Sequence, residues 1–486
     1  SRAFMAAYNS WNGIPMSIHP CLEEITRKQW GNNGIICTDG GALKLLIEAH
    51  KSFPSFAEGA AAVVKATTGQ FLDVYVPYVK EALEKGLLTE ADIDKAIRGN
   101  IFVALKLGLL DGDHSRNPYL SIGKDSTQAP PFMTAEARRL AREVTAKSVV
   151  LLKNKNLLPL DAGKLRKIAV IGPYSDKIVQ DWYSGTPPYE TTILSGIRNA
   201  VKEGTEIIHA EDNRMGQAEK AAAAADIAIV CVGNHPYGTR ADWKFSPVPS
   251  DGREAVDRKS LMLPDEDLVK LVLKANPNTI LVLVSSFPYT INWSQEHVPA
   301  IVHITHCSQE QGNGLADVLF GKVNPAGRTV QTWVKDIIDL PDMMDYDIRN
   351  GRTYMYHQGP VLYPFGYGLS YSDFTYEKIE SVKQDKKNIR VTVSVKNTSG
   401  RDGEEVVQLY ASYPDSKVER PSKQLRAFKR IPIKAGETRE VTLTVPKEEL
   451  GYWNEGKQMF IVEPGTVKLL IGASSEDIRL EGKIRL

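Results

Sequence analysis

Short apolar runs alternate with amphipathic segments in the first part of the chain, from residue 1 to about residue 113. Residues 34–37 (GIIC) predict a buried strand. Apolar residues at helical spacing predict helices at residues 57–65, 74–85 and 89–107. Thr89 is the expected N-cap of the last helix, because its hydroxyl can accept a hydrogen bond from the first turn. This region therefore consists of βα units, with too few strands to close a barrel.

A second series of strands and helices follows a stretch rich in Ser, Pro, Asn and Gly at residues 113–131, which is typical of a linker. Its strands are continuous apolar runs, which indicates burial on both faces and a parallel sheet flanked by helices. The predicted strands are residues 167–172, 205–209, 227–233, 279–285 and 300–306. A ligand site is expected where the carboxyl ends of such strands meet.

From about residue 371 onward, apolar and polar residues alternate with period two. The alternation is clearest at residues 389–395, 405–410 and 439–445. Such segments predict a small antiparallel β-sandwich, because one face of each strand packs inside and the other meets water. The pattern as a whole therefore predicts an α/β multidomain protein that ends in a β-sandwich.

Composition and charge narrow the function. At 486 residues the chain is too long for a single compact core, so several domains are expected. The formal net charge is +1, with Lys and Arg spread along the sequence, so we expect neither nucleic acid nor an anionic membrane as partner. No apolar run is long enough to span a bilayer, and no signal peptide is visible. The four separated cysteines indicate neither a disulfide scaffold nor a zinc site.

Asp39 follows the predicted buried strand and precedes Gly40 and Gly41. A carboxylate at the carboxyl end of a parallel strand is where barrel enzymes place catalytic groups, and the two glycines let a substrate approach closely. An aspartate in this position is also a common helix N-cap. From the residues alone, both interpretations of Asp39 stay open.

A long polar and aromatic loop, residues 233–264, follows one of the predicted parallel strands. Such loops are usually functional, although its acidic residues Glu254 and Asp257 could equally form a solvated face. His303 and His306 lie in or beside an apolar strand, where a hydrogen-bonded core histidine is favoured over a metal ligand. The segment after the first strand of this domain lacks G-x-G-x-x-G, and no Walker loop is present, so a nucleotide enzyme is disfavoured.

A group of motifs near the N-terminus resembles the nucleophile region of glycoside hydrolase family 3, in which an aspartate ends a strand after a W-G-x-x-G turn. The motifs are residues 5–13 (MAAYNSWNG), 30–31 (WG) and 34–39 (GIICTD). Later groups are similar to the start and end of the family's α/β sandwich domain and to its lead into a fibronectin type III-like domain. They are residues 148–160 (SVVLLKN to LPL), 316–328 (ADVLFG to NPAGR) and 363–371 (YPFGYGLSY).

The resemblance covers essentially the whole chain and implies three parts: the C-terminal part of a (β/α)8 TIM barrel, an α/β sandwich with a mostly parallel sheet, and a fibronectin type III-like β-sandwich. The first half of the family's barrel has no counterpart before Ser1. We expect that half to be a separate chain, to have been cleaved from this one or to be absent from this sequence. The expected protein partner is therefore that half as a separate chain, or alternatively a second copy of this chain in a homodimer. The expected boundaries are residues 1–112 (barrel part), 113–145 (linker and first helix), 146–345 (α/β sandwich), 346–370 (second linker) and 371–486 (last domain).

The family implies a retaining exo-β-glycosidase that needs no cofactor or metal and removes terminal nonreducing β-D-glucosyl or β-D-xylosyl residues from oligosaccharides or glycosides. Asp39 matches the nucleophile. Residues 254–258 have the family's E-x-x-D-R spacing, which assigns the acid/base role to Glu254, with Asp251 as runner-up. Such carboxylate pairs lie roughly 5 to 5.5 Å apart across the scissile bond. The competing class is a catalytically incomplete carbohydrate-binding or interaction protein.

Tyr8, Trp11, His235 and Trp243 are candidates for sugar contact, because aromatic faces suit the apolar face of a pyranose; for Trp11, core packing is an equal alternative. Many β-glucosidases of the family carry Trp after the nucleophile, where this chain has Gly40. One wall of the subsite therefore differs, and glucoside and xyloside specificity both stay open. Family members commonly work outside the cytoplasm, which implies a periplasmic or secreted protein.

Overall fold

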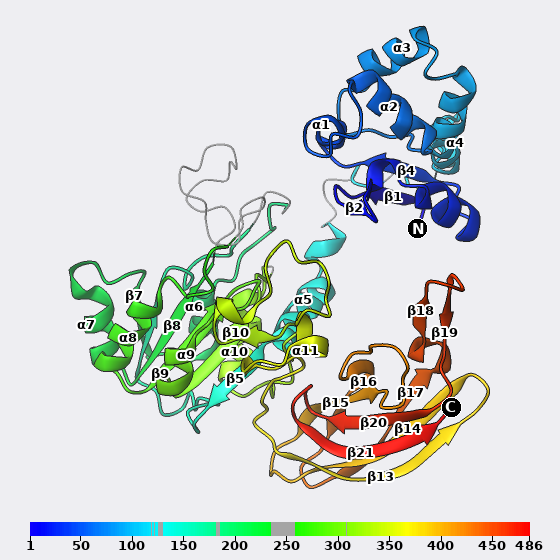
Figure 1. The fold of residues 1–486 in the computed structure, drawn as a ribbon. Coiled ribbons are helices and arrows are strands. Elements are labelled where there is room, and N and C mark those ends of the chain that lie inside the picture. Colours follow the sequence, from blue (N-terminus) through cyan, green and yellow to red (C-terminus); the bar gives the residue numbers. More distant parts are fainter. Residues whose placement is uncertain (118, 121, 125–129, 181–184, 235–257, 308) are drawn as a thin grey trace. The chain divides into compact units, whose positions relative to one another are not determined.

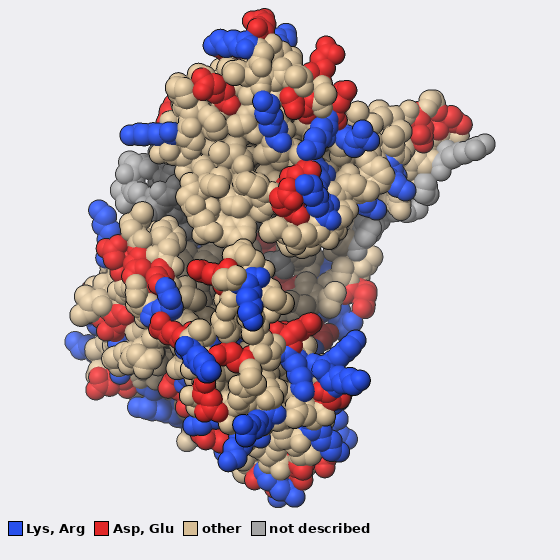
Figure 2. Space-filling view, turned by 45° about the vertical axis from the view of Figure 1, so that its right-hand side comes forward, with Lys and Arg blue, Asp and Glu red and all other residues tan. Residues whose placement is uncertain are grey.

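The structure is a computed structural model that describes residues 1–117, 119–120, 122–124, 130–180, 185–234, 258–307 and 309–486. It divides into two compact units, Ser1–Ala129 and Pro130–Leu486, which are described separately (Figure 1). Figure 2 shows Lys and Arg interspersed with Asp and Glu on the visible face, without a field of one sign. Among the described helices, none combines the length and the apolar character needed to cross a membrane.

The first unit contains a short parallel strand pair and helices. Strand β1 (Ala3–Ala6) pairs in parallel with β4 (Ile35–Thr38), and a parallel bridge joins Cys37 to Gln70. The main helices are α1 (Ala42–Glu48), α2 (Phe56–Lys65), α3 (Val76–Glu84) and α4 (Glu90–Lys106), with a π-helix at Leu22–Gln29. Thr89 caps α4 in a capping box with Asp92, as the sequence predicts. Closure of these elements into a barrel stays a prediction.

The second unit is built on a six-stranded sheet with the order β5-β10-β9-β8-β6-β7. Its strands are β5 (Val150–Asn154), β6 (Lys167–Ile171), β7 (Glu206–Ala210), β8 (Ile227–Gly233), β9 (Thr279–Val284) and β10 (Ala300–Ile304). Strands β6 to β10 are parallel, which confirms the sequence prediction. Strand β5 is not among the strands predicted from continuous apolar runs. It pairs antiparallel with β10 at the edge of the sheet.

Helices cover both faces of this sheet. One apolar core includes residues of α5 (Ala135–Ser148), α6 (Ile193–Ala200) and α10 (Gln311–Leu319), and the other includes residues of α7 (Gln217–Ala224) and α8 (Glu266–Ala275), beside α9 (Asn292–His297). Successive strand residues alternate between the cores: Val282 belongs to the first and Leu283 to the second. Helices α6 and α10 approach so closely that a Cβ on Gly196 would lie 2.1 Å from the backbone of Gly312.

The C-terminal part is an antiparallel sandwich (Figure 1), which confirms the period-two prediction. One sheet has the order β13-β14-β17 and the other β16-β15-β20-β21. The strands are β13 (Phe374–Gln384), β14 (Asn388–Asn397), β15 (Gly403–Ser412), β16 (Gln424–Ile433), β17 (Thr438–Pro446), β20 (Thr466–Gly472) and β21 (Ile478–Arg485). A buried ion pair of 3.0 Å between Arg328 and Glu405 on β15 ties the segment after α10 to the sandwich. That segment includes β11 (Trp333–Val334), α11 (Thr353–Tyr356) and β12 (Val361–Tyr363).

Candidate active site

Three chain segments of the first unit end at the same edge of its small parallel sheet. Ala6 at the end of β1 is paired with Thr38 at the end of β4, and Thr38 donates its N–H to the carbonyl of Gln70 at 3.0 Å. Asp39 follows β4 directly, at this edge, and its side chain is half-buried. Since the carboxyl ends of parallel strands are where barrel enzymes carry catalytic groups, this edge is the candidate active site.

Asp39 is not the cap of the helix that follows it. Helix α1 begins after Gly41, which has φ +79° and provides no capping side chain. The N–H of Gly41 donates instead to the Asp73 carboxylate, whose other oxygen accepts from Leu43 N–H at 3.5 Å. Asp73 therefore satisfies the exposed donors at the start of α1. The alternative interpretation of Asp39 as an N-cap is therefore wrong. Among the described residues, its carboxylate accepts a hydrogen bond from the N–H of the adjacent Gly40, at 2.8 Å.

Tyr8 holds the turn at residues 39–41 from the other side. Its hydroxyl donates to the carbonyl oxygen of Gly40 at 2.5 Å. The Tyr8 carbonyl in turn accepts from Nε2 of His50, which follows α1, at 2.9 Å. A Cβ on Gly40 would meet no atom of the described residues within 4 Å, and Gly40 is exposed. Of the two glycines, only Gly41 is therefore required by backbone geometry, and position 40 has room for a larger side chain.

Trp11 lies in a tight hairpin formed by Ser10–Trp11 and Ile14–Pro15. Asn12 and Gly13 both have positive φ, of 51° and 81°, as a two-residue hairpin turn of this hand requires. The indole stacks on the His19 ring with a centroid separation of 4.7 Å and is 46% exposed. The indole is therefore not buried among the described residues, and its role in sugar contact stays a prediction.

The other predicted site residues lie in the second unit. His235, Trp243, Asp251 and Glu254 fall outside the described residues. The last member of the E-x-x-D-R motif, Arg258, is described: its guanidinium lies 3.8 Å from the centroid of the Phe287 ring and donates to the carbonyl of Pro288 at 3.1 Å.

Asn234, the last described residue before this gap, directly follows β8. Its carbonyl accepts from His306 Nε2 at 2.9 Å, and its side-chain oxygen accepts from the N–H of Ser286 at 3.3 Å. Ser286 and His306 follow β9 and β10, so Asn234 is held where the carboxyl ends of three parallel strands meet, as expected for an α/β sheet.

The strand histidines are hydrogen-bonded to backbone, which supports the core interpretation. Nε2 of His303 bonds to the carbonyl of Ser285 at 3.0 Å. Burial lowers the pKa of His303 to about 4, so at neutral pH the ring is uncharged and Nε2 carries the proton that this bond needs. The described residues contain no group of three His, Cys, Asp or Glu side chains arranged to hold a metal ion.

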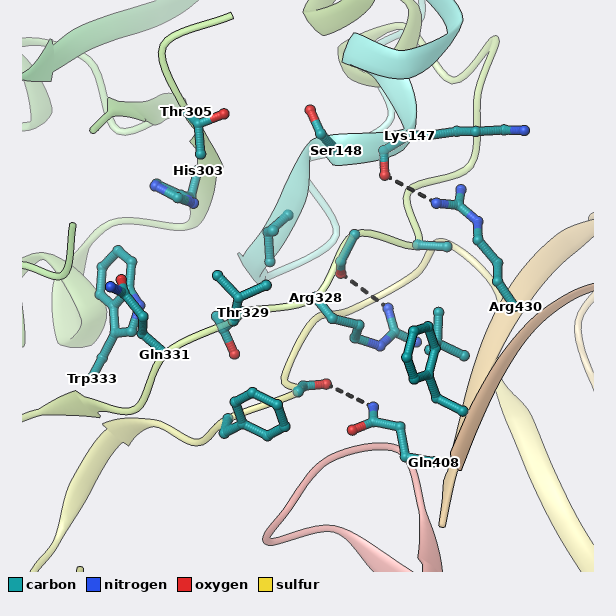
Figure 3. Close-up of a pocket in the computed structure, with 18 of the residues that line it drawn as sticks. Lys147, Ser148, His303, Thr305, Arg328, Thr329, Gln331, Trp333, Gln408 and Arg430 are labelled. Atoms are coloured by element: carbon teal, nitrogen blue, oxygen red, sulfur yellow. Dashed lines mark hydrogen bonds between the residues drawn. The ribbon is translucent and has the colours of Figure 1, made fainter. Parts of the chain in front are cut away.

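A cavity of about 480 Å³ lies between the six-stranded sheet and the sandwich (Figure 3). Aromatic side chains such as Phe287, Trp333 and Phe428 line it, and Arg430 crosses one end to donate to the Lys147 carbonyl at 3.0 Å. Its described lining residues include no Asp or Glu. A retaining glycosidase needs two carboxylates, so we do not assign catalysis to this cavity.

Sequence reasoning missed Asp73. The chain just before Asp73 joins the sheet through a single bridge at Gln70 and not through a full strand. One bridged residue leaves no periodic apolar pattern in the sequence. The remaining signal was an acidic residue shortly before an amphipathic helix, which does not by itself indicate a role at a different helix. Only the long-range pairing of Asp73 with α1 reveals that it positions the turn after Asp39.

Three family models match the chain. They are "Glycosyl hydrolase family 3 N terminal domain" at residues 1–100, "Glycosyl hydrolase family 3 C-terminal domain" at residues 149–371 and "Fibronectin type III-like domain" at residues 405–475. The first match places residues 1–100 in the family's N-terminal domain. The expectation that an earlier part of the barrel is missing stays a prediction.

Curated relatives and solved structures agree with these matches. A "Periplasmic beta-glucosidase" of Salmonella typhimurium is 30% identical, over 99% of this chain and 67% of that protein. A "Beta-xylosidase" of Formosa agariphila is 29% identical, over 97% of this chain and 67% of that protein. The structure of a β-glucosidase from Erythrobacter marinus superposes with a TM-score of 0.83 at 26% identity, covering 99% of this chain and 67% of that one. The chain thus spans about two thirds of the length of these proteins.

Proposed function

This chain belongs to glycosyl hydrolase family 3 and is a glycoside hydrolase, and on this basis we propose that it removes terminal nonreducing β-D-glucosyl or β-D-xylosyl residues by a retaining mechanism with Asp39 as nucleophile. The observation that carries the proposal is the position of Asp39. It stands at the carboxyl end of β4, and Asp73 has taken over the capping of α1. Its carboxylate is thus not committed to the helix.

In the first step, an oxygen of the Asp39 carboxylate bonds to the anomeric carbon while the bond to the leaving-group oxygen breaks and that oxygen takes a proton from the general acid. In the second step, water attacks the anomeric carbon, loses its proton to the same group and releases Asp39. Both steps need a nucleophile held at a fixed angle. The bonds from Tyr8 to Gly40 and from Asp73 to Gly41 supply this by fixing the turn on both sides.

For the acid/base role we propose Glu254, with Asp251 as the alternative. The acid must be protonated before the glycosidic bond breaks, and burial under a bound sugar would favour that state. We expect Glu254→Gln to slow substrates with poor leaving groups far more than those with good ones, which need little proton donation. If Asp251→Asn shows this pattern and Glu254→Gln does not, the roles are exchanged.

For the substrate we propose a β-glucoside or β-xyloside, because the relatives named above include a β-glucosidase and a β-xylosidase. The space beside Gly40 among the described residues supports a subsite in which one wall differs from that of β-glucosidases with Trp at this position. The ratio of kcat/KM for 4-nitrophenyl β-D-glucoside and β-D-xyloside decides between the two sugars. A periplasmic or secreted location is proposed by analogy with the Salmonella relative.

The decisive experiment traps the covalent intermediate. Incubation with an activated 2-deoxy-2-fluoro-β-glucoside or the corresponding xyloside, followed by peptide mapping, should place the sugar on the peptide that contains Asp39. An adduct on a different carboxylate would refute the nucleophile assignment. Inversion of the anomeric configuration, observed by NMR during turnover, would refute the retaining mechanism.

A further inference from the structure

A second cavity of about 480 Å³ lies where the segment after α10 meets the sandwich, apart from the cavity of Figure 3. Thr332, His357 and Tyr354 line it from the segment that contains β11, α11 and β12. Lys423 and Ser475 line it from the sandwich, before β16 and after β20. The volume is within the range of small-molecule sites.

Three of the side chains that line this cavity carry buried polar atoms without a hydrogen-bond partner in the structure. They are Oγ1 of Thr332, Nε2 of His357 and Oγ of Ser475. Ser475 is fully buried, with a relative exposure of 0%. Leaving a buried polar group unpaired costs about 1 to 3 kcal/mol, so three such groups around one cavity call for a polar occupant.

The charges of the cavity are already balanced. Lys423 forms an ion pair of 2.8 Å with Glu476 and also donates to the backbone carbonyl of Ser475. These two are the charged members among the described residues that line the cavity. An anionic ligand would meet the Glu476 carboxylate, and a cation would meet Lys423, so the balance favours an uncharged ligand.

The unpaired groups determine which neutral ligand fits. A hydroxyl can act as donor or acceptor, and an imidazole nitrogen is one or the other according to its tautomer, which matches the hydroxyl groups of a polyol. The Tyr354 ring, fixed by stacking on Phe365 at 4.3 Å, and the neighbouring Pro360 provide an apolar wall for the C–H face of a sugar ring. We propose that this cavity is a second binding site for a small neutral polyol of the monosaccharide class, distinct from the site at Asp39.

The proposal is tested by calorimetric titration of the purified protein with D-xylose and with D-glucose. We compare the wild type with the double variant Thr332→Val, Ser475→Ala, which removes two of the unpaired atoms with little change in shape. Because those atoms have no partner among the described residues, the variant should be at least as stable as the wild type and should keep its hydrolytic rate. Its affinity for the sugar that binds the wild type should fall about tenfold.

Two controls separate this site from others. Thr305→Val makes the same change in the cavity of Figure 3 and should leave the affinity unchanged. The double variant should show the same loss of affinity when it is made in the Asp39→Ala background, so that failure of the nucleophile assignment and failure of this proposal are distinguishable. The proposal is overturned by the absence of saturable binding, by equal affinity in the double variant, or by crystals soaked in xylose that show only water in the cavity.

Discussion

The turn at residues 39–41 and the six-stranded sheet hold their side chains by different means. The turn is fixed by directional hydrogen bonds from distant segments, those of Tyr8 to Gly40 and of Asp73 to Gly41. The sheet is fixed by apolar packing on both faces, with Val282 and Leu283 fully buried in opposite cores. A polar substitution at the turn should therefore alter chemistry with little loss of stability, and an apolar truncation in the sheet should do the reverse.

The strongest test at the turn is Asp39→Ala. Removing the nucleophile should lower kcat by roughly four orders of magnitude or more, because no covalent intermediate can form. The free energy of unfolding should change by less than about 0.5 kcal/mol, since among the described residues the carboxylate is hydrogen-bonded to the adjacent Gly40 and not to a distant element. Steady-state kinetics and urea unfolding measure the two effects. Full turnover in this variant would show that Asp39 is not the nucleophile and that the turn does not carry the chemistry.

In the sheet, the corresponding test is Leu283→Ala. The side chain is fully buried, so its truncation should cost about 2 to 5 kcal/mol through lost burial and the cavity left behind. The rate per folded molecule should be unchanged. Leu340→Ala is the matched control in the same unit, because Leu340 is 44% exposed and should cost far less. Equal shifts in the urea midpoint would contradict the role given to burial.

His303 makes the sheet sensitive to acid. Burial lowers its folded pKa from 6.5 to about 4, so between these values the unfolded chain binds a proton that the folded protein does not. Stability should therefore fall by roughly 2 to 3 kcal/mol as the pH drops through that window, and His303 adds no pH dependence above it. Urea unfolding at a series of pH values measures the slope. His303→Gln should flatten it, whereas a substitution of the exposed His297 should not.

Asp73 tests whether the turn is fixed from a distance. Asp73→Ala removes the bonds to Gly41 and Leu43 and should lower kcat about tenfold or more, with KM less affected, because the nucleophile loses its fixed orientation. Asp73→Asn keeps an acceptor oxygen and should recover most of the rate. If both variants lost only stability, with kcat intact, Asp73 would act only as the cap of α1 and would not position the nucleophile.

The smallest effect is expected for Tyr8→Phe. The substitution removes one hydrogen bond to the Gly40 carbonyl and keeps the ring, so kcat should fall a few-fold, consistent with a loss of about 0.5 to 1.5 kcal/mol. Tyr8→Ala should fall further if the ring also contacts the sugar. Similar rates for the Phe and Ala variants would show that the hydroxyl alone matters.

Much of the fold follows from local pattern. Continuous apolar runs predicted strands β6 to β10, period two predicted the sandwich, and the Thr89 cap was visible in the sequence. The position of Asp39 after a buried strand was also predictable. These features depend on residues close together in the chain, whose spacing records which side of an element is buried.

Tertiary structure decided what local pattern left open. It placed β5 antiparallel at the sheet edge, gave the cap of α1 to Asp73 and brought Thr332, His357 and Ser475 to one cavity. Gly41 and Asp73 are 32 residues apart, and no periodicity relates them. Such long-range hydrogen bonds form only between segments that the folded chain brings together. The sequence by itself therefore determined the elements and the candidate nucleophile, and only folding determined which groups hold that nucleophile in place.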